Sequence, residues 1–111
     1  MSISTHVLDT MRGSPAAGLG VTLLRREPNG GWEVIGRAET DADGRARELT
    51  DEELEVGEYR LDFDTQPYFE RSGLSAFYPE VSVAFNLEDP AGHLHVPLLL
   101  SLYGYTTYKG T

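Results

Sequence analysis

The sequence predicts an all-β sandwich of a single domain, spanning residues 1–111, that carries one short helix. Apolar and polar residues alternate over several short runs, which is the period of half-buried strands. Glycine, proline and asparagine interrupt these runs about every 8–12 residues, a spacing typical of sandwiches with seven or eight strands. A chain of 111 residues is long enough to bury a core without disulfides or a structural metal.

The expected strands follow one another along the chain with tight turns between them. The segment Pro28–Gly31 resembles a hairpin turn, and Asp41–Gly44 predicts a second tight connection. The runs that alternate most clearly cover residues 4–9, 21–25, 32–36, 59–63, 81–85 and 94–98.

One short helix is expected after the strand at 59–63. Asp64 or Thr65 can cap its start, Pro67 suits the first turn, and Gly73 suits the residue beyond its end. The segment 50–53 resembles a capping box, with Thr50 and Glu53 as the reciprocal pair of a single turn.

Composition excludes several classes of function. The chain has a net charge of -9, from 18 acidic and 9 basic residues, and such a field repels nucleic acids and anionic membrane surfaces. With no cysteine, disulfides, thiol catalysis and cysteine-bound zinc are excluded. No apolar window is long enough to span a membrane, and the first four residues lack the features of a secretory signal. We therefore expect a cytoplasmic protein.

The three histidines lie in two strand-like segments at opposite ends of the sequence, and they are the strongest candidates for chemistry. Alternation places Ser4, His6 and Leu8 on one face of the first strand, and His93 and His95 on one face of a late strand. The intervening residues of the late strand face the core: Leu94, Val96, Leu98 and Leu100.

If the two ends meet, the histidines can form an acid/base site, because imidazole exchanges protons near neutral pH. Two other interpretations stay open at this point. Each histidine can be an ordinary surface or hydrogen-bonded residue, or the three imidazoles can hold a catalytic zinc ion.

Two further groups of residues carry chemistry in principle. Arg45 and Arg47 lie on the same strand face just after a turn, where either guanidinium can bind an anion or a developing oxyanion. The alternative is that both are solvated charges that protect an edge strand. The ending, 103–111, holds three tyrosines and one lysine, which is typical either of docking to a core or partner subunit or of an ordinary last strand.

Several motifs resemble the transthyretin family. The opening Ser-Thr-His-Val-Leu-Asp at 4–9, followed by Arg-Gly-Ser-Pro-Ala at 12–16, is similar to the start of that family. The run Leu-His-Val-Pro-Leu-Leu-Leu-Ser at 94–101 and Tyr-Gly-Tyr at 103–105 resemble its enzyme branch, the 5-hydroxyisourate hydrolases. The histidines and the arginine mark this branch, because carrier members have other residue types there.

The resemblance implies a transthyretin-like (prealbumin-like) sandwich of two four-stranded sheets with one short helix, assembled as a homotetramer, a dimer of dimers. It implies hydrolysis of 5-hydroxyisourate to 2-oxo-4-hydroxy-4-carboxy-5-ureidoimidazoline in urate degradation, a branch of purine catabolism, without a metal or other cofactor. The alternative within the family is a small-ligand carrier without catalytic activity.

The resemblance also assigns residues. The catalytic residues are His6, Arg45 and His95, which also bind substrate, and the further substrate-binding residues are Tyr108, Lys109 and Thr111. His93 receives no role, and its loss is expected to be tolerated. The family ending is typically Tyr-Arg-Gly-Ser; here Lys109 keeps the charge without the bidentate fork, and Thr111 keeps the hydroxyl.

Overall fold

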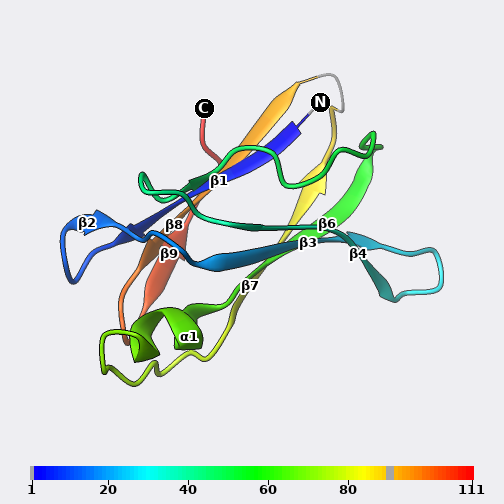
Figure 1. The fold of residues 1–111 in the computed structure, drawn as a ribbon. Helices are drawn as coiled ribbons and strands as arrows, with labels where there is room; N and C mark the ends of the chain where they lie inside the picture. Colours follow the sequence, from blue (N-terminus) through cyan, green and yellow to red (C-terminus); the bar gives the residue numbers. More distant parts are fainter. Residues whose placement is uncertain (1, 90–91) are drawn as a thin grey trace.

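The computed structural model describes residues 2–89 and 92–111 as a sandwich of two β-sheets with one helix at an end of the molecule (Figure 1). The prediction of an all-β sandwich with a short helix is confirmed. The first sheet contains β1 (Ser2–Asp9), β2 (Ser14–Pro15), β5 (Arg45–Ala46), β8 (His93–Leu100) and β9 (Tyr105–Thr107). The second contains β3 (Gly20–Arg26), β4 (Trp32–Glu39), β6 (Gly57–Phe63) and β7 (Val81–Leu87).

The first sheet has five strands rather than the expected four, because one sheet position is shared by two short strands. Its order is β2-β1-β8-β9, and β5 also pairs with β1. Both β2 and β5 are two residues long, and they pair with different parts of β1. The other edge of β1 is occupied by β8 along its whole length, so β2 and β5 lie end to end.

The pairing of β1 with β8 is parallel, whereas the other strand pairs are antiparallel. It brings the two ends of the sequence side by side, with Ser4 opposite His95 and His6 opposite Pro97. Thr5, whose exposed fraction is 1%, reinforces the pairing by donating its hydroxyl to the carbonyl of Val96 at 2.6 Å. Register therefore decides which side chains of the two ends become neighbours.

The core lies between the sheets and follows from the alternation of apolar residues. On β6, Tyr59, Leu61 and Phe63 are fully buried, and alternate residues of the facing strands complete the layer. Among them are Ile3, Val7, Val21, Leu23, Val81, Leu98 and Leu100. Because successive side chains of a strand point to opposite faces, burying Val7 and Leu98 leaves His6 and Pro97 on the outer face of the first sheet.

The turn at 41–44 is confirmed, and it positions β5 against β1. The Asp41 carboxylate accepts the backbone N–H of Asp43 at 2.9 Å and of Arg45 at 3.0 Å. Gly44 has a φ of +77°, and a Cβ there would lie 2.4 Å from the Val7 carbonyl oxygen. Glycine is therefore required both by the backbone conformation and by the close approach to β1.

The helix α1 (Thr65–Glu70) is where the sequence predicts it, although its cap differs. Asp64 is the N-cap residue, but its side chain makes no capping hydrogen bond, and the Thr65 hydroxyl donates to the Tyr78 carbonyl at 2.6 Å. Gly73 follows the helix with a φ of +75°, as expected. None of the helical segments in the described part of the chain is long and apolar enough to cross a bilayer.

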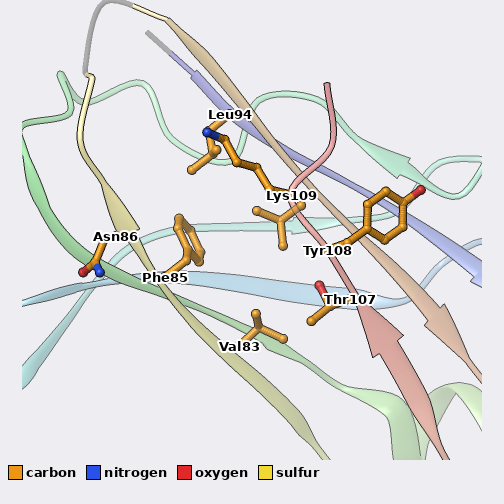
Figure 2. Close-up of a pocket in the computed structure, with 8 residues that line it drawn as sticks. Val83, Phe85, Asn86, Leu94, Thr107, Tyr108 and Lys109 are labelled. Carbon is orange, nitrogen blue, oxygen red and sulfur yellow. The ribbon is translucent and has the colours of Figure 1, made fainter.

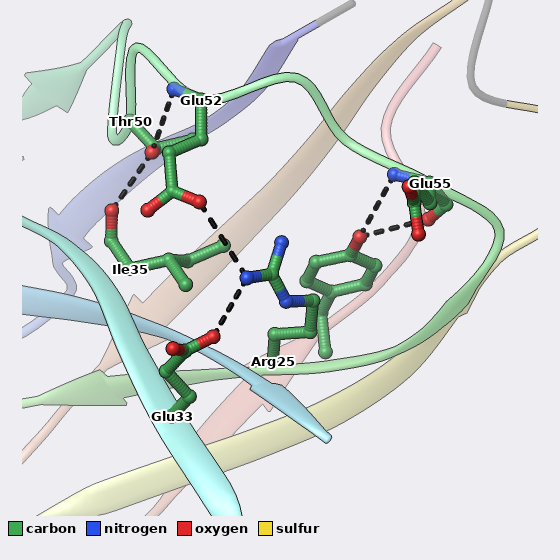
Figure 3. A network of polar contacts seen from close by, with 7 residues as sticks. Arg25, Glu33, Ile35, Thr50, Glu52 and Glu55 are labelled. Carbon is green, nitrogen blue, oxygen red and sulfur yellow. Dashed lines mark hydrogen bonds and ion pairs between the residues drawn. The ribbon is translucent and has the colours of Figure 1, made fainter. Parts of the chain in front are cut away.

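The predicted capping box at 50–53 is wrong, because this segment forms a bend and no helical turn. The Thr50 hydroxyl donates to the Ile35 carbonyl at 2.8 Å and accepts the Glu52 N–H at 3.1 Å (Figure 3). Glu52 in turn lies 3.5 Å from Arg25, which also contacts Glu33 at 2.6 Å. Tertiary hydrogen bonds to β4 therefore replace the local helical ones.

We expect Gly44→Ala to lower the free energy of unfolding more than Gly13→Ala does. Both positions have positive φ, but nothing lies within 4 Å of a Cβ at Gly13, so that variant carries only the backbone strain of about 1–2 kcal/mol. Gly44→Ala adds displacement of the Val7 carbonyl from β1. Urea unfolding at fixed protein concentration, followed by the fluorescence of the single tryptophan, Trp32, measures both. Equal losses would contradict the packing argument.

Candidate active site

A pocket of about 250 Å³ opens on the outer face of the first sheet, where the two ends of the sequence meet. It contains two histidines, two arginines and three hydroxyl-bearing residues from segments far apart in the sequence. Its lining is Ser4, Thr5, Arg45, Arg47, His93, His95 and Thr111. The structure thus brings together three of the predicted site residues, Arg45, His95 and Thr111, in one cavity.

His95 is held from both sides. Ser4, its partner across β1 and β8, places Oγ 2.8 Å from the His95 Nδ1. On the other edge of β8, the Gly110 N–H donates to the His95 carbonyl at 2.8 Å. A Cβ on Gly110 would lie 2.7 Å from the His95 Cδ2, so the close approach of the chain ending to the imidazole requires glycine.

Arg45 and His6 are brought together by strand pairing. They are register partners between β5 and β1, which places their side chains on the same face of the sheet. The His6 Nε2 lies 2.8 Å from the Asp43 carbonyl, and a carbonyl accepts only, so this nitrogen carries the proton. The turn at 41–44 therefore positions both the guanidinium of Arg45 and the ring of His6.

The surroundings of His95 favour its neutral form. Burial lowers the pKa of its imidazole below the ordinary value, and the charge of Arg45 lowers it further, followed by smaller contributions from His93 and His6. A histidine that stays neutral at pH 7 can accept a proton from water. Of the predicted pair, His95 therefore suits the role of general base.

Two predicted substrate-binding residues lie elsewhere in the subunit. Tyr108 and Lys109 line a different pocket, of about 240 Å³, together with Phe85 and the core-facing Leu94 and Val96. Figure 2 shows Lys109 extending towards Leu94, which is on the opposite face of β8 from His95 because side chains alternate. Within one subunit these two residues do not join the histidine pocket, and their contact with substrate stays a prediction.

The resemblance assigned no role to four pocket residues: Ser4, Thr5, Arg47 and His93. Of these, only Arg47 was considered as an anion-binding residue from the sequence pattern. Alternation already placed Ser4 on the face of His6, but only the register of β1 against β8 sets it opposite His95. His93 lies two residues before His95 on the same face, and Ser4 Oγ is 2.8 Å from its Nε2. Alternation in the sequence therefore showed that Ser4 and His93 face outward, but only the pairing of β1 with β8 shows that they contact each other and His95.

The predicted alternative of a three-histidine zinc site gains no geometric support. Among residues 2–89 and 92–111, no group of three or more His, Cys, Asp or Glu side chains is arranged to hold a metal ion. Hydroxyl and carbonyl oxygens already occupy one ring nitrogen of His6 and of His95.

Comparison with known proteins gives a consistent family match. The model of the HIUase/Transthyretin family matches residues 3–110. The 5-hydroxyisourate hydrolase of Salmonella dublin is 44% identical over 110 residues, which cover 98% of this chain and 80% of that protein. The 5-hydroxyisourate hydrolase of Mus musculus is 43% identical over 111 residues, covering 98% of this chain and 94% of that protein.

Solved structures of two kinds share the fold. The 5-hydroxyisourate hydrolase of Klebsiella pneumoniae superposes with a TM-score of 0.87 at 31% identity, covering 100% of both chains. Sea bream transthyretin in complex with thyroxine gives a TM-score of 0.92 at 32% identity, covering 100% of this chain and 96% of that one. Because both superpose well, the fold does not separate hydrolases from transthyretins, and the side chains in the pocket have to do so.

The neutrality of His95 predicts its titration. We expect the His95 imidazole to titrate below the ordinary pKa of 6.5, as measured by the pH dependence of its NMR resonances. Arg45→Gln should raise this pKa, because it removes a nearby positive charge. Arg37→Gln on β4, in the other sheet, is the matched control and should leave the pKa unchanged.

The same shift has a consequence for stability. Because the folded pKa is lower than the unfolded one, the unfolded chain binds the proton more readily. The contribution of His95 to the free energy of unfolding is therefore fully present above pH 6.5 and is lost as the pH falls through the folded pKa.

In the NMR titration, an Arg45→Gln protein whose His95 titrated as in the wild type would contradict the electrostatic argument.

Proposed function

This chain belongs to the HIUase/Transthyretin family and is a hydrolase of 5-hydroxyisourate, and we propose that His6, Arg45 and His95 carry its catalysis without a metal. The product is 2-oxo-4-hydroxy-4-carboxy-5-ureidoimidazoline. The observation that supports this assignment is the strand pairing that sets Ser4 opposite His95 and His6 opposite Arg45. A carrier function is not favoured, because the curated relatives at 40–44% identity are named as hydrolases.

The reaction begins with proton removal from water. Neutral His95 takes one proton as the water oxygen forms a bond to a ring carbonyl carbon of the substrate. Negative charge grows on the carbonyl oxygen, and the guanidinium of Arg45 stabilises it through N–H donors. In a chain with a net charge of -9, the two arginines of the pocket also provide the local positive potential that an anionic substrate needs.

The second half of the reaction breaks the ring. The carbon–nitrogen bond cleaves, the departing nitrogen receives a proton, and the new carboxyl group loses one to become a carboxylate. We assign the proton donation to the Nδ1 of His6, because its Nε2–H is already held by the Asp43 carbonyl. The new carboxyl group returns a proton to this nitrogen, and His95 releases the proton taken from water to the solvent. Thr111 lines the pocket, and we propose that its hydroxyl binds substrate while Tyr108 and Lys109 close the site in the assembled protein.

We propose a homotetramer, a dimer of dimers, in the cytoplasm. Two observations support assembly. Among the described strands, β7 and β9 each lie at the end of a sheet with one edge of backbone groups that pairs with no described strand, and such edges accept another strand. Four large aromatic residues that are exposed in the subunit lie near this region: Phe77, Tyr103, Tyr105 and Tyr108.

The test of function uses 5-hydroxyisourate made freshly from urate by urate oxidase. Loss of its near-ultraviolet absorbance should be faster with the protein than without it, and His6→Ala or His95→Ala should lower kcat at least about 100-fold. Arg45→Glu should abolish activity by charge reversal, whereas Arg37→Glu on the other sheet should not. Normal turnover by all three site variants would refute the assignment.

Removal of metal ions separates the two catalytic schemes. Because imidazoles and a guanidinium suffice in the proposed mechanism, we expect dialysis against a chelator to leave kcat unchanged. A loss of activity that added zinc restores would instead support the three-histidine metal site.

A further inference from the structure

A continuous chain of hydrogen bonds links His95 to a second histidine. Ser2 Oγ lies 2.5 Å from the His93 Nδ1, Ser4 Oγ lies 2.8 Å from the His93 Nε2, and the same Ser4 Oγ lies 2.8 Å from the His95 Nδ1. The two imidazole rings are 6.4 Å apart and nearly parallel, at 20°. Ser4 itself is only 7% exposed, so water competes little for its hydroxyl.

The Ser4 hydroxyl has a single proton, which it can give to only one of its two histidine partners. If Ser4 donates to His95, the proton of the neutral His95 ring sits on Nε2, and this histidine has no lone pair left for water. If Ser4 donates to His93 instead, it accepts the Nδ1–H of His95. The His95 Nε2 is then unprotonated and, within the described residues, makes no hydrogen bond to the protein.

The charges in the pocket select between the two arrangements. Arg45 and Arg47 line the same cavity as His95, and positive charge nearby favours a lone pair over an N–H on the nitrogen that faces it. Either arrangement is complete at its far end, because the Ser2 hydroxyl can accept the Nδ1–H of His93 or donate to an unprotonated Nδ1. The hydrogen bonds beyond Ser4 therefore fit either direction, and the choice rests on the charges that line the pocket with His95.

Building on the proposed function, we propose that His93 is a positioning residue, which acts through the Ser4 hydroxyl to keep the proton of neutral His95 on Nδ1 and its Nε2 free as the base. His93 does not touch the reacting atoms. It accepts the Ser4 hydroxyl proton, and this fixes the direction of the remaining hydrogen bonds. The tautomer of a histidine is set by the bond that its other nitrogen makes, which is the role that Ser4 and His93 share here.

This inference reverses the expectation that loss of His93 is tolerated. We expect His93→Leu, which has no acceptor, and Ser4→Ala to lower kcat about tenfold with little change in KM, because substrate contacts remain. His93→Gln should restore most of the rate, since its amide oxygen can accept the Ser4 proton near the position of Nε2. Ser72→Ala, exposed after α1, is the matched serine control and should behave as the wild type.

The tautomer itself can be observed by nitrogen NMR of protein labelled in its histidine rings. In the wild type and in His93→Gln, His95 should carry its proton on Nδ1, and in His93→Leu and Ser4→Ala this preference should be lost. The other ionisable groups around His95 are Arg45, Arg47, His6 and His93, so all spectra are compared at one pH above the titration of the imidazoles. Trp32 fluorescence checks that each variant is folded.

The outcomes are separable. Protonation of His95 on Nε2 in the wild type overturns the inference without any variant, and so does wild-type kcat in folded His93→Leu. The spectra need no substrate, so they test the hydrogen-bond chain by themselves. Failure of the proposed function would show differently, as unaltered decay of 5-hydroxyisourate in the presence of the wild-type protein.

Discussion

The parallel pairing of β1 with β8 is the constraint on which the rest of this structure depends. It joins segments about ninety residues apart in the sequence, and its register alone decides that Ser4 meets His95. The buried Thr5 hydroxyl and the apolar side chains on the inner face hold that register, because a slip by one residue would turn every side chain of β1 to the opposite face. Core packing on the inner face of the first sheet therefore positions the pocket residues on its outer face.

The second requirement is a positively charged pocket in a chain whose net charge is negative. The chain is strongly acidic, yet its pocket gathers two guanidinium groups from the short β5 and the segment after it. The turn that presents Arg45 is built from the Asp41 carboxylate and Gly44, so a negative side chain organises a positive site. The charge of the same arginine lowers the pKa of His95, so in the proposed mechanism the residue that stabilises the oxyanion also keeps the base neutral.

Much of the fold could be predicted from the sequence, because strand alternation and turn residues are local signals. The hairpin at Pro28–Gly31, the helix near Thr65 and the outward faces of His6 and His95 all follow from patterns within a few residues. The capping box at Thr50 failed because a hydrogen bond to Ile35 on a neighbouring strand outweighed the local pattern. The residues around Thr50 do not indicate which distant residues it will contact.

In the candidate site, too, local patterns were predictable and contacts between distant residues were not. Alternation alone identifies which residues face outward, but it cannot tell that Lys109 lies over the core side of β8 while Gly110 lies against His95. The contact of Ser4 with His95 could not be predicted for the same reason, because a serine in a strand is ordinary until its neighbour across the sheet is known. The sequence predicted which residues face outward, but it did not predict which of them are neighbours across the sheet.

The pairing of the first strand with the eighth also bears on how the molecule is made. During synthesis β1 is made about ninety residues before its lengthwise partner β8, so one edge of β1 stays open while the strands between them are made. Contacts between such distant segments form slowly, and an open strand edge invites association with other chains. Until β8 pairs with β1, a nascent chain therefore exposes a strand edge that a fold closing strand by strand would cover sooner.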